Sequence, residues 1–235
     1  MLIENMPTYV YILFLISLFM ALFFIAISSG FNRSVILTII FWGVLQSVVS
    51  LTGFYLNQNV TIPRFPLLII PPIIFILSCL SSKIGKYHLA TFDLKNLILI
   101  HIIRVPIELV LYFLAQKKVV PWLVTFEGGN YDILSGLTAP LIYYMVYVKR
   151  RFGWKILLIW NIICLFLLIN VVFHAVLSFP SKFQLFSYEQ PNIGLLYFPF
   201  ILLPSVLVPL VLFAHLTSIY QLVTKKKFQF IDLKS

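Results

Sequence analysis

Three side chains able to carry charge or exchange protons lie within eight residues of an otherwise apolar stretch. They are His101, Arg104 and Glu108 in the segment HIIRVPIE. A helix turns by about 100° per residue, so the three side chains fall on one face. Ionisable groups inside a long apolar run are costly and often mark a binding site or proton path. Arg104 and Glu108 are four residues apart and could also neutralise each other, so a structural ion pair and a functional site both remain open.

The loop after this segment holds more polar groups. Glu127, Asn130 and Asp132 lie within TFEGGNYD, and the side chain of Asn130 or Asp132 is expected to cap the helix that follows. Small residues share one face of that helix with Asp132, and such a strip lets two membrane helices approach closely. They are Ser135, Gly136 and Ala139.

Histidines suggest two further kinds of site. His174 is expected near the end of its segment that lies toward Glu108 and Asp132. Carboxylates with a histidine suit a divalent metal or a protonatable ligand, although a single histidine at a helix end is often structural. His101 and His215 are both expected on the opposite side, where a pair of histidines could hold a haem. We assign no metal ligand and no cofactor from these patterns.

The composition defines the class of protein. Of 235 residues, 61% are hydrophobic and 10% are charged, whereas a soluble domain of this length needs more polar surface. We therefore expect an all-α integral membrane protein with a single transmembrane bundle over residues 1–235 and the lipid bilayer as its surroundings. The 17 Lys+Arg against 7 Asp+Glu indicate orientation rather than nucleic-acid binding. Cys79 and Cys164 lie in apolar segments as small hydrophobic residues.

A membrane-spanning helix needs about 20 largely apolar residues. Seven such segments are predicted, at residues 8–28, 35–56, 65–80, 94–114, 131–148, 156–177 and 194–222. The third is the weakest because it is short and contains Pro71 and Pro72. The last contains Pro199, Pro204 and Pro209, so we expect it to be bent or locally unwound.

Basic residues give the expected orientation, since Lys and Arg are enriched in short cytoplasmic loops. An outside amino terminus places most of them on the cytoplasmic side, namely Arg33, Lys83, Lys86, Lys149, Arg150, Arg151, Lys155, Lys225, Lys226, Lys227 and Lys234. The outer side then holds Arg64, Lys117, Lys118 and Lys182. We therefore predict an inner-membrane protein with its amino terminus outside and residues 223–235 as a short basic cytoplasmic tail.

Several motifs along the chain resemble those of a group of small uncharacterised bacterial membrane proteins. The first is H-x-x-R-x-P-x-E at residues 101–108. The second is T-F-E-G-x-N-x-D-x-x-x-G-x-T-A-P at residues 125–140, and the third is E-Q-P-N at residues 189–192, before a proline-rich last helix. The resemblance covers nearly the whole chain. It implies a seven-helix architecture and no known activity.

The leading functional hypothesis is that the protein binds or transports a small molecule or ion. We expect an outward-facing polar cavity floored by Arg104 and Glu108, because the charged face points toward the outer half, where most acidic residues lie. One alternative is a metal-dependent membrane enzyme that uses Glu108, Asp132 and His174 on a lipid-like substrate. Another is an accessory subunit of a membrane complex without a site of its own.

Overall fold

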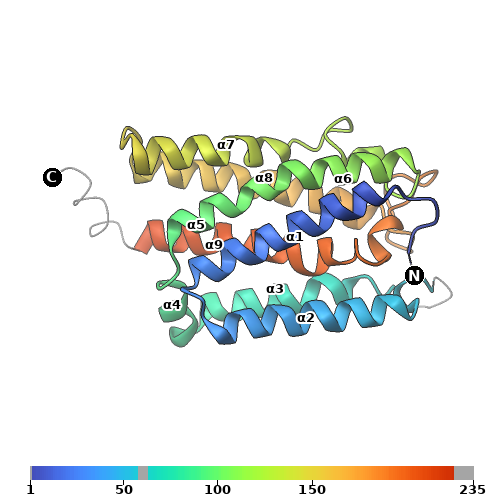
Figure 1. Ribbon diagram of the computed structural model, residues 1–235, viewed down its shortest axis with the longest axis horizontal. Helices are drawn as coiled ribbons and strands as arrows, with labels where there is room; N and C mark the ends of the chain where they lie inside the picture. Colours follow the sequence, from blue (N-terminus) through green and yellow to red (C-terminus); the bar gives the residue numbers. More distant parts are fainter. Residues whose placement is uncertain (1, 58–62, 225–235) are drawn as a thin grey trace.

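The computed structural model describes residues 2–57 and 63–224, and every regular element in these ranges is helical. The predicted basic cytoplasmic tail lies almost entirely outside these residues. The long helices run back and forth along one axis (Figure 1). They are α1 (Thr8–Ser28), α2 (Arg33–Leu51), α3 (Pro66–Ser81), α5 (Leu94–Leu99) with α6 (Arg104–Gln116), α7 (Ile133–Tyr143), α8 (Trp154–Leu177) and α9 (Val208–Thr224), with the short α4 (Lys83–Leu89) after α3.

Five helices in the described residues are long and apolar enough to cross a membrane. They are Thr8–Ser28, Arg33–Leu51, Leu94–Gln116, Trp154–Leu177 and Leu203–Thr224. These correspond to five of the seven predicted segments. The molecule is therefore an all-helical protein with the features of a membrane protein.

The two other predicted segments form shorter helices. α3 has 16 residues, which at a rise of about 1.5 Å per residue is shorter than a hydrocarbon layer of about 30 Å. Together α3 and α4 are apolar enough to be one broken span, but the chain bends by 96° between them. At this bend Ser82 Oγ accepts a hydrogen bond from Gly85 N and caps α4. α7 and the π-helical turn η4 (Tyr144–Val148) form the second short apolar helix.

The fourth predicted segment changes its helical type close to the charged residues. α5 ends at Leu99, the 3-10 turn η2 covers Ile100–Ile103, and α6 begins at Arg104. Pro106 has no N–H to donate to the carbonyl of Ile102, so the regular α-helical bonding is interrupted at this place. This change of helical type lies where the chain must position Arg104.

The last predicted segment is not one continuous helix. It starts with the 3-10 turn η5 (Gly194–Leu196), continues through a turn, forms the π-helical turn η6 (Leu203–Leu207) and becomes regular only in α9. The predicted local unwinding is confirmed. The helix start predicted at residue 194 is wrong, because the prolines remove backbone donors in the first part of the segment.

The core and the outer surface of the bundle are both apolar. Phe14 of α1, Ile103 of η2 and Phe200 before η6 are at most 1% exposed and belong to the same core cluster. By contrast, Phe41 of α2 and Phe166 of α8 are 69% and 67% exposed. Large exposed hydrophobic surfaces are unusual in soluble monomers and are expected for helices that face lipid.

Candidate functional site

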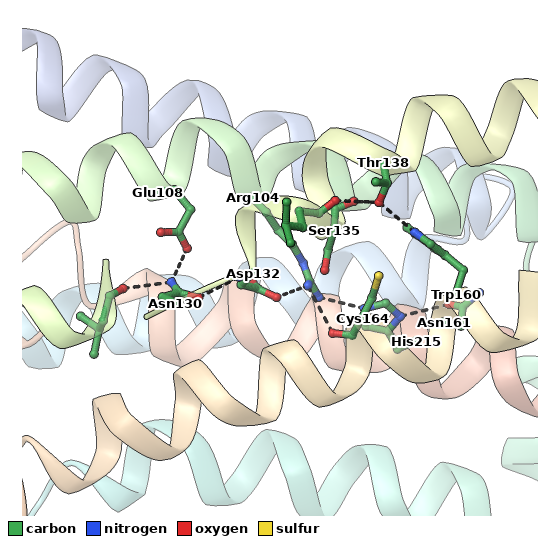
Figure 2. Close-up of polar contacts among 12 residues, drawn as sticks. Arg104, Glu108, Asn130, Asp132, Ser135, Thr138, Trp160, Asn161, Cys164 and His215 are labelled. Atoms are coloured by element: carbon green, nitrogen blue, oxygen red, sulfur yellow. Dashed lines mark hydrogen bonds and ion pairs between the residues drawn. The ribbon is translucent and has the colours of Figure 1, made fainter. Parts of the chain in front are cut away.

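Arg104 forms the centre of a buried polar network (Figure 2). Its side chain is 4% exposed and forms an ion pair through Nη1 with Oδ1 of Asp132. Its Nη2 lies 2.9 Å from Nε2 of His215 on α9. The first residue of α6 is thus held by a residue just before α7 and by a residue of α9.

A glycine allows α7 to approach Arg104. A Cβ atom at Gly136 would lie 2.8 Å from Cγ2 of Val105 and 3.2 Å from Cβ of Arg104. Such distances are too short for a side chain without displacement of its neighbours. Ser135 and Ala139 beside it are also buried. The prediction that this strip of small residues permits close helix contact is therefore confirmed.

His215 links Arg104 to α8. Its Nδ1 lies 3.0 Å from Oδ1 of Asn161. A guanidinium only donates hydrogen bonds, so Nε2 of His215 accepts from Arg104 and Nδ1 carries the proton that is donated to Asn161. The Nδ2 of Asn161 donates to the carbonyl of Leu157 at 3.0 Å. These contacts fix both the orientation and the neutral form of the imidazole.

His101 packs against His215 instead of joining it through a ligand. The two ring centroids are 3.9 Å apart with an angle of 16° between the planes. Both rings are fully buried, and neither nitrogen of His101 has a hydrogen-bond partner among the described residues. The hypothesis that His101 and His215 hold a haem between them is wrong, because their rings are in direct stacking contact and leave no space for a macrocycle.

Glu108 and Asn130 form the other part of the network. Nδ2 of Asn130 donates to Oε1 of Glu108 at 2.5 Å and to the carbonyl of Val124 at 3.0 Å, while its Oδ1 accepts from the backbone N–H of Asp132 at 2.9 Å. Asn130 therefore connects Glu108 to the segment that carries Asp132. The predicted side-chain cap of α7 is not formed by Asp132, whose carboxylate pairs with Arg104 instead.

The loop that presents Asn130 is tightly folded. A Cβ atom at Gly128 would lie 1.9 Å from the carbonyl oxygen of Trp122, so a residue with a side chain cannot occupy this position without moving the backbone. Oγ1 of Thr125 donates to the same carbonyl at 2.8 Å. Gly129 has φ of +105°, a conformation that favours glycine.

The expected ion pair between Arg104 and Glu108 does not form. In the described residues Arg104 pairs with Asp132, although Glu108 lies only one helical turn away. Glu108 is 2% exposed, and among the described residues it has no cation within ion-pair distance and its Oε2 has no hydrogen-bond partner. A buried carboxylate in this situation must either take up a proton or be joined by a positive group.

Glu108 and Asp132 both line a small cavity. Its volume is about 70 Å³, enough for one or two water molecules or a small ion. The other lining residues are mostly apolar and come from α3, α6, α8, the loops and η6, among them Ile69, Ile107, Leu111, Leu168, Val172, Phe179 and Leu203. This small cavity differs from the predicted polar one, because apart from the two carboxylates its lining residues are apolar and Arg104, which was expected at its floor, does not line it.

Two predicted site residues lie elsewhere. Glu127 is exposed on its loop. Nδ1 of His174 lies 2.9 Å from the carbonyl of Asn170, one turn earlier on α8, and the ring lies beside Phe186. Within residues 2–57 and 63–224, no group of three or more His, Cys, Asp or Glu side chains could hold a metal ion. The suggested cluster of Glu108, Asp132 and His174 is thus not formed.

Asn161 is a member of the network that was not predicted from the sequence. It is fully buried in α8 and bonds to His215. A single amide in a long apolar segment is the same kind of signal as the charges of HIIRVPIE. The sequence therefore indicates that Asn161 is unusual, but it does not show that His215 is its partner.

Residues 67–223 match a protein family described as a domain of unknown function (DUF8737). The match covers more than half of the chain. The chain belongs to this family. The network residues all lie in the part that matches DUF8737, namely His101, Arg104, Glu108, Asn130, Asp132, Asn161 and His215. This agrees with the expected membership of an uncharacterised family. No curated protein and no solved structure matches the chain.

Proposed function

We propose that this protein is an integral membrane protein that binds and transports a small cation at Glu108. The observation that carries the proposal is the carboxylate of Glu108, which is buried, lines a cavity and has no cationic partner within residues 2–57 and 63–224. Arg104 does not supply that partner because it pairs with Asp132. A cation bound beside Glu108 would offset the cost of the buried charge.

Two features of the surroundings support a small, positively charged ligand, namely the hydrogen bonding of Glu108 and the size of the cavity. Asn130 occupies one oxygen of Glu108, so the other oxygen is left for the ligand. The cavity of about 70 Å³ limits the ligand to a small ion with little or no water. Asp132 lines the same cavity, and its negative charge is balanced by Arg104.

We further propose that the protein is a single bundle that crosses the inner membrane seven times. Its amino terminus lies outside, and its basic tail lies in the cytoplasm. The helices run back and forth along one axis in Figure 1, which supports repeated crossings. Seven crossings require that the short helices α3 and α7 also span the membrane. Lys and Arg enrichment near the start of α2, in α4 and before α8 supports the orientation. The Glu108 end of the network then faces the outside.

The binding proposal is tested by thermal unfolding of the purified protein in detergent, with sodium, potassium or magnesium chloride compared with choline chloride at equal ionic strength. Binding to the folded state raises stability by about 2.7 kcal/mol at a ligand concentration of 100 times Kd. We expect at least one of the three metal cations to raise the melting temperature of the wild type.

Two isosteric variants make this test specific. Glu108→Gln should lose the cation-dependent rise, whereas Glu127→Gln, which changes an exposed carboxylate of the nearby loop, should keep it. Cation flux into proteoliposomes should follow the same order. An unchanged cation response in Glu108→Gln, or no response to any cation in the wild type, would contradict the proposal.

A further inference from the structure

A large cavity in the described residues lies away from the Arg104 network. It is an open groove with a volume of about 670 Å³, lined mainly by residues of α2, α3, α4, η6 and α9. Binding sites for organic ligands commonly have volumes of about 300–1,000 Å³. This groove is thus of a size that suits a molecule far larger than an ion.

The groove exists because α2 is poorly covered by the rest of the bundle. Only Gln46 and Ser50 among its residues are buried, and in Figure 1 α2 and α3 lie on the side of the bundle away from α7 and α8. Ser50 Oγ donates to the carbonyl of Leu196 at 3.0 Å, and Gln46 accepts from Tyr55. These polar contacts lie toward the end of α2, whereas the groove opens along its first half.

Most of the groove wall is apolar. Its floor is formed by residues of η6 and α9, and its sides by residues of α2 and α3, including Phe41, Trp42, Pro71, Pro72, Phe75, Ile76, Val206, Pro209, Leu210 and Phe213. Pro209 cannot donate to the carbonyl of Ser205, and Nε1 of Trp42 donates to this carbonyl instead at 2.8 Å. Because the carbonyl of Ser205 is paired in this way, the floor of the groove presents an apolar surface there.

One end of the groove is polar, and three basic residues that do not line it are direct sequence neighbours of its lining residues. Lining side chains there include Asn32, Ser34, Ser82 and His88. Three basic residues, Arg33, Lys83 and Lys86, alternate with these lining positions in the sequence. No acidic residue occurs between Glu4 and Asp93, so no carboxylate of the helices on either side offsets these charges.

Asp93 is the acidic residue that follows this region, and it is already engaged. Its Oδ1 accepts from the backbone N–H of Lys95 at 3.2 Å and its Oδ2 from Nδ2 of Asn96 at 2.5 Å. Its carboxylate thus caps α5. The carboxylate keeps its negative charge, but the three bases Arg33, Lys83 and Lys86 outnumber it, so the charge beside this end of the groove is complementary to an anion.

We propose that the groove binds one membrane lipid with an anionic phosphate headgroup. The acyl chain lies between α2 and α3 over the floor of η6 and α9, and the phosphate lies among Arg33, Lys83 and Lys86. Apolar walls bind the chain through the hydrophobic effect, and basic side chains near the membrane surface attract anionic headgroups. This site is independent of the cation site at Glu108.

The test is native mass spectrometry of the full chain in detergent, titrated with phosphatidylglycerol or with phosphatidylcholine of the same acyl chains. The wild type should bind one phosphatidylglycerol in preference to phosphatidylcholine. Triple replacement of Arg33, Lys83 and Lys86 by Ala should weaken phosphatidylglycerol binding by at least about tenfold, since each base near the surface contributes on the order of one decade or less.

A matched triple variant controls for general charge. Lys149→Ala, Arg150→Ala and Arg151→Ala remove the same charge from the turn between α7 and α8, outside the groove, and should change the affinity less than about twofold. Equal losses in the two triple variants would show unspecific attraction to the surface and overturn the proposal. So would equal binding of the two lipids by the wild type.

A second variant blocks the groove and leaves every charge in place. Thr38 of α2 lines the groove and is exposed, so Thr38→Trp places an indole in the space assigned to the acyl chain. Binding of phosphatidylglycerol should fall by at least about tenfold while the melting temperature shows that the protein is folded. Wild-type binding by a folded Thr38→Trp protein would overturn the assignment of the groove.

Discussion

Arg104 shows how one residue can determine the polar interior of a bundle. Its guanidinium contacts Asp132, the imidazole of His215 and the carbonyl of Cys164. Asn130 and Asn161 extend this network at its two ends, toward Glu108 and His215 (Figure 2). Each charged or amide group thus depends on a partner from another element, and the removal of one partner leaves the other unpaired in an apolar surrounding.

The ion pair between Arg104 and Asp132 gives the first prediction at the residue scale. Arg104→Gln should destabilise the folded protein by about 3–5 kcal/mol, because it leaves the carboxylate of Asp132 buried without its cation. Asp132→Asn should be destabilising for the reciprocal reason. Reversible unfolding of the protein in mixed micelles measures both effects.

The double variant Arg104→Gln/Asp132→Asn completes the cycle. It contains no uncompensated charge at this pair, so it should be less destabilised than the sum of the two single variants, with a coupling energy of about 0.5–3 kcal/mol. Additive losses would show that the pair does not stabilise the fold as a unit.

At the scale of elements, close helix contact depends on where small residues occur. Gly136 permits the contact of α7 with the start of α6, since a Cβ there would meet Val105 at 2.8 Å and Arg104 at 3.2 Å. Gly43 of α2 has more space, and a Cβ there would lie 3.7 Å from Cγ2 of Val206. The two glycines therefore have different roles in otherwise similar helices.

Replacement of these glycines by alanine should have opposite effects. Gly136→Ala should destabilise the protein by about 1–3 kcal/mol through overpacking. Gly43→Ala should leave stability unchanged or raise it by up to about 1 kcal/mol, because alanine favours a helix and fits the available space. Melting temperatures in detergent provide the comparison, and equal destabilisation by both substitutions would contradict the assigned role of Gly136.

At the scale of the whole molecule, the two ends of the bundle differ in charge. Basic residues near the start of α2, in α4 and in the turn before α8 accumulate at one end, and the loop with Glu127 lies at the other. Gln221 near the end of α9 also belongs to the basic end, where its Nε2 donates to the carbonyls of Leu89 and Phe92 at 2.8 and 2.9 Å. The long helices between these ends provide the apolar middle.

The proposed orientation predicts which residues a membrane-impermeant thiol reagent can reach in intact cells. In a background with Cys79 and Cys164 replaced by Ser, Lys118→Cys should react before lysis, because it lies on the proposed outer side. Arg150→Cys should react only after lysis. The reverse order would indicate the opposite orientation, and reaction of both before lysis would contradict the number of crossings between them.

The helical class, the apolar segments and the local relations within a helix can be predicted from the order of the amino acids alone. The shared face of His101, Arg104 and Glu108 follows from helical periodicity, and the small residues beside Gly136 follow from their spacing. The broken start of the last helix follows from Pro199, Pro204 and Pro209. These features depend on residues that are close in the chain, so the sequence contains the information directly.

Which polar groups contact each other could not be predicted in this way, because it depends on how the helices pack. Arg104 pairs with Asp132 and not with Glu108, and His215 bonds to Asn161 while it stacks on His101. These choices depend on the rotation and the lateral position of helices that are far apart in the sequence, which side-chain packing of the entire bundle sets. That packing places Glu108 beside a cavity, with no cationic partner in the part of the chain that the structure describes, whereas the sequence also allowed an ion pair between Glu108 and Arg104.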